Sequence, residues 1–265
     1  WRRIEVKKLA GAPSYAYVND LKADNFNENV VYAVLDNHKY GDFRPYVYKS
    51  TDKGKSWRSI SSNIPERTLT WRIVQDHVKK DLLFLATEFG IYFSINSGKR
   101  WSKIKGGVPT ISFRDLAIHK RENDLVGASF GRGFYVLDDY SSLRFLSASS
   151  LKNNLVFSPR KALQYNPIRS GSTSQGSNTY YAKNPDYGAI LTFYLSDEIL
   201  TKKQMRLKVE KGLEKSNSNI PFPGWKELDD ELNEKTPITI IEIYNNENSF
   251  IAVSYTHLTL PTSRS

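Results

Sequence analysis

The chain has 265 residues, no Cys, and 38 Lys and Arg against 28 Asp and Glu, which gives a formal net charge of +10. The lack of Cys excludes disulfide scaffolds, thiolate zinc sites, iron–sulfur clusters and cysteine nucleophiles. The sequence has no apolar run near the roughly 18 residues that a membrane helix needs. Aromatic residues make up 13% of the chain and favour strands over helices, so we expect an all-β protein.

A repeated pattern, Trp-x-x-Ile, occurs at Trp1, Trp57 and Trp101. Strand-like runs lie before and between these copies in a regular order, at residues 17–22, 30–35, 71–75, 82–87, 113–118 and 124–129. Four short strands in a unit of roughly 40 to 45 residues are typical of a β-propeller blade. The sequence therefore predicts about three blades, the last of which ends at Asp139 without the Gly and Trp of the others, as a terminal repeat would.

The turn before each later Trp resembles the Asp-box, or BNR repeat, whose pattern is Ser-x-Asp-x-Gly-x-Thr-Trp. The first copy has Ser50, Asp52, Gly54, Ser56 and Trp57. The second copy has Ser94, Asn96, Gly98 and Trp101, and departs from the pattern by Asn96 for Asp and Arg100 for Thr. Asp-boxes occur in sialidases, sortilin-type receptors, xyloglucanase-type glycosidases and exported bacterial propellers. Residues 86–92 and 129–139 look most like the bacterial proteins called BNR-repeat glycosyl hydrolases or sortilin N-terminal-like.

The chemistry of the Asp-box favours a structural role. The carboxylate of Asp52 can accept backbone N–H groups of the turn, Gly54 supplies a positive φ, and Trp57 buries its ring at the start of a fourth strand. The alternative is that Asp52 contacts a ligand. In a blade the turn after the third strand lies on the same face as the turn after the first, so we expect the Asp-boxes on the back of the propeller.

The opposite, front face is where propellers usually bind ligands, an expectation from fold analogy. The loops and strand starts expected there contain five candidate ligand-binding residues, namely His38, Arg72, Glu88, Arg114 and Arg132. Two arginines at the start of equivalent inner strands could clamp a carboxylate, as the arginine cluster of sialidases does. The alternative is that Arg72 and Arg114 form ion pairs with Asp115 or Asp20 in the channel wall.

Other chemistries find little support in the sequence. The histidines His38, His77 and His119 are not expected to converge on one ion, so no metal site is predicted, and no cofactor is expected. Lysines cluster in residues 199–215 among glutamates, which indicates a solvated helix, and we expect no nucleic-acid partner and no membrane span. The catalytic residues, the oligomeric state and the identity of the ligand are not indicated.

The organisation changes after the repeats. We expect propeller blades in residues 1–147, a connector in 148–186, and the start of a small β-sandwich-like module in 187–252, with strands at 187–195 and 237–244 and a helical insertion at 196–235. The sandwich assignment comes from the resemblance. Residues 253–265 resemble the translation of a sequencing adapter, and Trp1 is not a natural start, so we expect the chain to be a fragment and set residues 253–265 aside.

The resemblance implies an exported protein, secreted or periplasmic, whose propeller binds or scaffolds a protein or glycan. The alternative is a glycoside hydrolase of sialidase or related type, whose acid pair and nucleophile would lie largely outside this chain. The sequence leaves enzymatic activity undecided and favours binding for the part seen here.

Overall fold

The computed structural model describes residues 4–164, 188–197, 199–235 and 238–257. The chain forms two compact units, Trp1–Tyr194 and Leu195–Ser265, and each is described by itself. The first unit contains the repeats and positions the candidate site.

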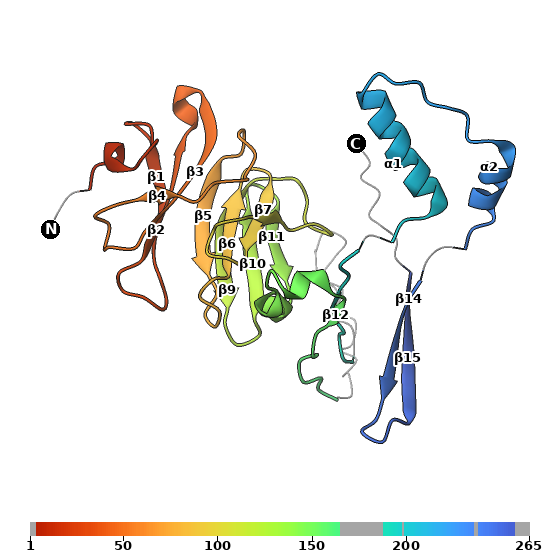
Figure 1. Ribbon diagram of the computed structural model, residues 1–265. Helices are drawn as coiled ribbons and strands as arrows, with labels where there is room; N and C mark the ends of the chain where they lie inside the picture. The colour runs from red at the N-terminus through yellow and green to blue at the C-terminus, as the bar shows by residue number, and fades with distance from the viewer. Residues whose placement is uncertain (1–3, 165–187, 198, 236–237, 258–265) are drawn as a thin grey trace, which may run out of the picture. The chain divides into compact units, whose positions relative to one another are not determined.

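Three antiparallel sheets follow one another along the first unit, and neighbouring strands are adjacent in chain order (Figure 1). Blade 1 consists of β1 (Tyr17–Ala23), β2 (Val31–Asn37), β3 (Asp42–Ser50) and β4 (Arg58–Ser59). Blade 2 consists of β5 (Thr70–Gln75), β6 (Leu83–Thr87), β7 (Gly90–Ser94) and β8 (Ser102–Lys103). Blade 3 consists of β9 (Phe113–His119), β10 (Asp124–Ser129) and β11 (Gly133–Leu137). The predicted strand runs coincide with these strands apart from their end residues.

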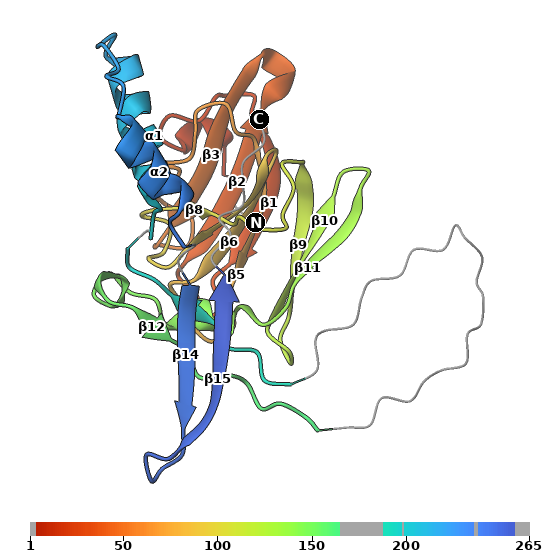
Figure 2. The same ribbon diagram turned by 90° about the vertical axis from the view of Figure 1, so that its right-hand side faces the viewer.

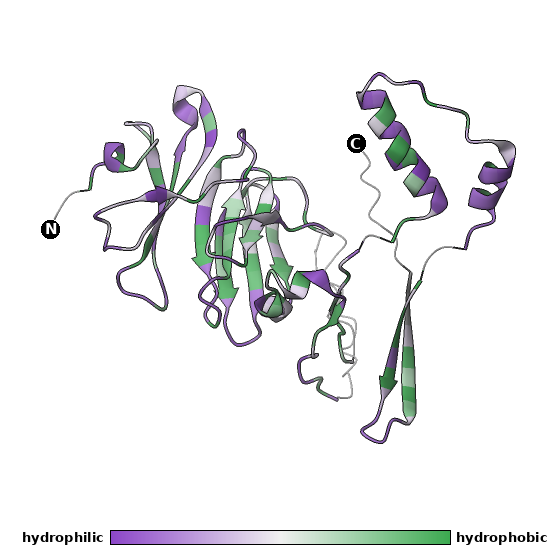
Figure 3. Cartoon of the chain, in the orientation of Figure 1, coloured by the Kyte–Doolittle hydropathy of each residue, from purple (hydrophilic) through white to green (hydrophobic). Residues whose placement is uncertain are grey.

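Two hydrophobic layers separate the three blades. The layer between blades 1 and 2 includes Tyr32, Val34, Val47, Ile73, Leu83 and Leu85. The layer between blades 2 and 3 includes Trp71, Phe84, Ala86, Phe113 and Leu125. Because successive side chains of a strand point to opposite faces, β6 contributes to both layers and is buried along its whole length. Figure 3 shows the hydrophobic residues along these strands. Meander sheets stacked face to face in this way are blades of a β-propeller.

Two isoleucines of the Trp-x-x-Ile pattern, Ile4 and Ile60, contact the turn of the blade that follows them in sequence. A Cβ atom at Gly98 would lie 2.7 Å from Cδ1 of Ile60, and one at Gly54 would lie 2.9 Å from Cδ1 of Ile4. Both glycines also have positive φ, +83° and +79°. Each of these isoleucines therefore packs directly on the glycine of an Asp-box-like turn, where a larger residue would collide with it.

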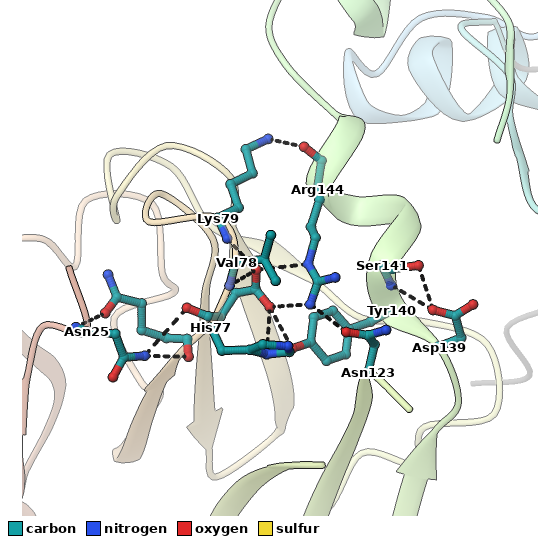
Figure 4. Close-up of polar contacts among 11 residues, drawn as sticks. Asn25, His77, Val78, Lys79, Asn123, Asp139, Tyr140, Ser141 and Arg144 are labelled. Carbon is teal, nitrogen blue, oxygen red and sulfur yellow. Dashed lines mark hydrogen bonds and ion pairs between the residues drawn. The ribbon is translucent and has the colours of Figure 1, made fainter. Parts of the chain in front are cut away.

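Blade 3 lacks a fourth strand because the chain enters a 3-10 helix, η3 (Tyr140–Phe145), where the Asp-box turn would stand. This helix is attached to the end of β5 through the fully buried carboxylate of Asp76. Asp76 accepts hydrogen bonds from Tyr140 Oη at 2.7 Å and from Nε and Nη2 of Arg144 at 2.9 and 2.8 Å (Figure 4). Burial alone would raise the pKa of Asp76, but these hydrogen bonds and the N–H of Lys79 lower the pKa to about 2.

The rest of the first unit is less regular. It contains a short 3-10 helix, η4 (Ser150–Lys152), and a small ladder of β12 (Leu155–Val156) with β13 (Phe193–Tyr194). The strand predicted at 187–195 is wrong in extent. Among the described residues 188–195, only residues 193–194 form a strand. The partner strand β12 has only two residues, which limits the length of the ladder. Tyr194 Oη also donates a hydrogen bond to the carbonyl oxygen of Leu151 at 3.2 Å.

The second unit contains the predicted helical insertion, which forms two helices, and a hairpin. Helix α1 (Lys202–Lys215) begins at a capping box of Thr201 and Gln204, and helix α2 (Trp225–Leu232) is joined to α1 by hydrogen bonds between Arg206 and Glu231. The hairpin pairs β14 (Ile238–Tyr244) with β15 (Phe250–His257) (Figure 2). Strand β15 extends into residues 253–265, which we set aside above as an expected artefact. Val, Tyr and Thr in this segment favour strand pairing whatever their origin.

Candidate functional site

Hydrogen bonds between turns assign each loop of the blades to a face. The Asp-box turns contact the turns between first and second strands, through Lys53 N–H to Asn29 and Ser97 N–H to Asp81, both at 2.9 Å. At the opposite end, Glu88 N–H donates to Leu69. Phe130 N–H there donates to Ser112, again at 2.9 Å. The second and third strands therefore turn on the face where the inter-blade loops run, which is the predicted front face.

The first Asp-box turn is closed by the side chains of Ser50 and Asp52. Asp52 accepts from Ser56 N–H and Ser56 Oγ at 2.9 and 2.6 Å, and from Ser50 Oγ at 2.8 Å. The Ser56 hydrogen bonds hold the pKa of Asp52 well below its usual range. Ser50 Oγ in turn accepts from the N–H groups of Gly54 at 2.8 Å and Asp52 at 3.3 Å.

The second Asp-box turn repeats this geometry with an amide in place of the carboxylate. Ser94 Oγ donates to Asn96 at 2.9 Å and accepts from Gly98 N–H at 2.9 Å, and Asn96 accepts from Arg100 N–H at 2.9 Å. A neutral Asn in the same role is consistent with a turn that needs an acceptor rather than a charge.

The two Asp-box tryptophans differ in burial. Trp101 is buried and its Nε1 donates to the carbonyl oxygen of Ile60 in blade 1 at 2.7 Å. Trp57 is half-buried and its Nε1 donates to Gly54 of its own turn at 3.1 Å. Trp101 lies against a preceding blade, which accounts for the difference.

Arg114 is the centre of a cluster on the front face. Its guanidinium lies 3.6 Å from the ring centroid of Trp71 and 5.2 Å from that of Phe130. Nη2 of Arg114 is 3.9 Å from Glu88 Oε2, an oxygen that accepts from Trp71 Nε1 at 3.0 Å and from Ser112 Oγ at 2.9 Å. The guanidinium thus lies between two rings beside one carboxylate, with its side chain 42% exposed.

Arg72 makes different contacts from Arg114. Its Nε donates to Asp115 at 2.7 Å and its Nη1 donates to Asp20 at 3.0 Å. The second oxygen of Asp20, which is buried, accepts from the N–H of Ile73 at 3.0 Å. Arg72 therefore joins the innermost strands β1, β5 and β9, as in the ion-pair alternative, and its charge is already compensated.

The remaining candidates lie at the edge of this cluster or apart from it. His38 packs edge-on against Trp71, with ring centroids 5.9 Å apart, and its Nδ1 contacts the buried carboxylate of Asp36. Arg132 is exposed and makes no hydrogen bond or ion pair within the described part of the chain. The structure brings together His38, Glu88 and Arg114.

Three contributing residues were not predicted from the sequence: Trp71, Ser112 and Phe130. The sequence did offer a signal for Trp71, since it is a large aromatic residue directly before Arg72 in an expected inner strand. We expected it only as a strand residue. In the described residues, no group of three or more His, Cys, Asp or Glu side chains could hold a metal ion. Neither described helix has the length and hydropathy to cross a bilayer.

Comparisons with protein-family models and with curated proteins gave no match. Among solved structures, the chain is similar to a GH74 enzyme from Niastella koreensis, with 21% identity over 46% of this chain and a TM-score of 0.39. It is also similar to YCF48 bound to a D1 peptide, with 20% identity over 48% of this chain and 37% of that chain and a TM-score of 0.35. A third is the Swd1 β-propeller domain from Myceliophteria thermophila, with 16% identity over 51% of this chain and 44% of that chain and a TM-score of 0.38. The chain spans 21% of the length of the Niastella enzyme. The stacked meander sheets make the first unit a partial β-propeller.

Proposed function

We propose that the chain is part of an exported Asp-box β-propeller that binds a protein or glycan at its front face. The observation that supports this proposal is the Arg114 cluster, in which a half-exposed guanidinium lies between Trp71 and Phe130. Partly exposed Arg and aromatic side chains are typical of binding hot spots. Membership of the Asp-box family and a secreted or periplasmic location belong to the same proposal.

The hydrolase alternative needs two carboxyl groups, or a Tyr and Glu pair, that face a sugar. Three of the front-face carboxylates are engaged by the protein itself. Asp36 is buried beside His38, Asp42 is paired with Arg44 at 2.9 Å, and Glu88 accepts from Trp71 and Ser112. These contacts favour a binding role for this part of the chain.

The test is calorimetric titration of the chain with three probes: an acidic peptide, N-acetylneuraminic acid and a xyloglucan oligosaccharide. We expect reversible binding of at least one probe, weakened roughly tenfold or more in Arg114→Ala by loss of a charge-assisted contact. Binding that is unchanged in Arg114→Ala would place the ligand elsewhere. Release of reducing sugar from the oligosaccharide would support the hydrolase instead.

A further inference from the structure

Exposed aromatic side chains gather on the front-face loops and strand starts of all three blades. We name them the aromatic rim. Their exposed fractions run from 43% to 75%, and they are Tyr15, Tyr17, Tyr40, Phe43, Phe89 and Phe130. Exposed apolar surface shared by several loops is typical of an interaction site.

Cations cover two of the front-face rings. Lys39 Nζ lies 4.4 Å from the ring centroid of Tyr17, and the guanidinium of Arg114 lies 3.6 Å from that of Trp71. The rings fix the positions of these charges at the surface.

The charges of the front face are unequally compensated. The carboxylates of Asp36, Asp42 and Glu88 each lie within ion-pair distance of a basic side chain, namely His38, Arg44 and Arg114. By contrast, Lys39 and Arg132 make no hydrogen bond or ion pair within the described residues. Glu66 and Arg67 on the inter-blade loop are both exposed, and their formal charges sum to zero. The front face therefore has positive charge that is not compensated internally, which favours an anionic partner.

We propose that the aromatic rim, with Lys39 and Arg114, binds an acidic polypeptide segment. The carboxylates of the segment would pair with Lys39 and Arg114, and its apolar side chains would pack on exposed rings such as Tyr40 and Phe130. This inference rests on the proposed binding function and names the ligand class for the same face.

The covered rings favour a polypeptide over a glycan. Arg114 lies over Trp71 and Lys39 lies over Tyr17, so at these two rings a ligand that pairs with the cation is favoured over a sugar that stacks on the ring. Tyr15 and Tyr40 also pack on each other, with centroids 5.9 Å apart. Mixed Tyr, Phe, Trp and Arg side chains are enriched at protein–protein interfaces.

The experiment measures fluorescence anisotropy with a labelled peptide of about a dozen residues rich in Glu and Tyr. Its analogue with Gln for every Glu tests the charge requirement, and an oligogalacturonate of equal charge competes against it. We expect roughly tenfold weaker binding for Arg114→Ala and for Phe130→Ser, and for the Gln analogue. Lys55→Ala removes one exposed charge from the back face and is expected to leave the affinity unchanged.

The outcomes separate the inference from the proposed function. Equal weakening in Lys55→Ala, or no effect of Phe130→Ser, would show non-specific attraction to a basic protein and overturn the inference. Binding of the oligogalacturonate but not of the peptide, lost in Arg114→Ala, would overturn the ligand class while the front-face binding function stands. Failure of both probes to bind would overturn the acidic-peptide assignment, and the neutral xyloglucan probe would then decide the function.

Discussion

The hydroxyl groups of Ser50 and Ser94 carry much of the hydrogen bonding in the two Asp-box turns. Each is buried and accepts an N–H from the glycine four residues later, Gly54 or Gly98, which is itself buried. Asp52 and Asn96 close the outer part of each turn. At this scale the side chains of the two turns satisfy backbone donors, and their chemistry concerns stability.

We expect Ser50→Ala to reduce the free energy of unfolding by about 1 to 3 kcal/mol, because Gly54 N–H is left buried without its acceptor. Chemical denaturation measures the change. Thr51→Ala is the matched control, since Thr51 is adjacent and exposed and makes no hydrogen bond in the described part of the chain. Equal losses in both variants would argue against this role of the hydroxyl.

Acid should weaken the attachment of η3 through Asp76. Its pKa of about 2 lies below the unfolded value of 3.8, so ionised Asp76 stabilises the fold above about pH 4. That contribution, about 2 kcal/mol, is lost as the pH falls from about 4 through 2. In Asp76→Asn we expect lower stability at neutral pH, since Arg144 loses its anionic partner and keeps only Asn123, and a smaller change between pH 4 and 2. Urea denaturation at a series of pH values tests this, and an unchanged acid slope in the variant would contradict it.

At the scale of elements, the strands were predictable because their apolar runs and turns repeat with a fixed period. The hydrogen bonds of Asp76 with Tyr140 and Arg144 could not be predicted. Tyr140 and Arg144 lie 64 and 68 residues after Asp76 in the sequence and meet it only through tertiary packing. Likewise Glu88 and Arg114 could be assigned to the front face by alignment of blades. However, Arg114 lies on Trp71 whereas Arg72 pairs with Asp20. This difference depends on side-chain packing, which an alignment of the blade sequences does not show.

The contact of Ile60 with Gly98 predicts that blade packing fails when the glycine gains a side chain. We expect Gly98→Ala to cost about 1 to 3 kcal/mol more than Gly106→Ala, because the new Cβ would meet Ile60. Gly106 has a similar φ of +77° with no neighbour within 4 Å, so it isolates the backbone strain. Equal melting temperatures for the two variants would rule out the contact as an inter-blade restraint.

At the scale of the whole molecule, the first and last blades expose apolar side chains. Leu21 on β1 is 63% exposed, and Phe134 and Val136 on β11 are 77% and 55% exposed. Propeller blades bury such surfaces against further blades. The chain expressed alone is therefore expected to be less stable than a complete propeller.

We expect the isolated chain to self-associate, and Leu21→Lys with Val136→Lys to raise the dissociation constant by roughly tenfold or more through lost apolar burial. Sedimentation equilibrium measures this. Val209→Lys, at an exposed position of α1, controls for added charge. A monomeric wild-type chain with one reversible unfolding transition would contradict the prediction.

We assign ligand binding to the front face and stability to the back face, and one paired measurement tests this division. Melting temperature and affinity for the Glu-rich peptide are measured for Arg114→Ala and Ser50→Ala. We expect Arg114→Ala to weaken binding roughly tenfold with little change in melting, since Arg114 is a partly exposed surface residue. Ser50→Ala should melt several degrees lower and bind normally. Lower melting with unchanged affinity in Arg114→Ala would contradict the account, because the cluster would then be part of the scaffold.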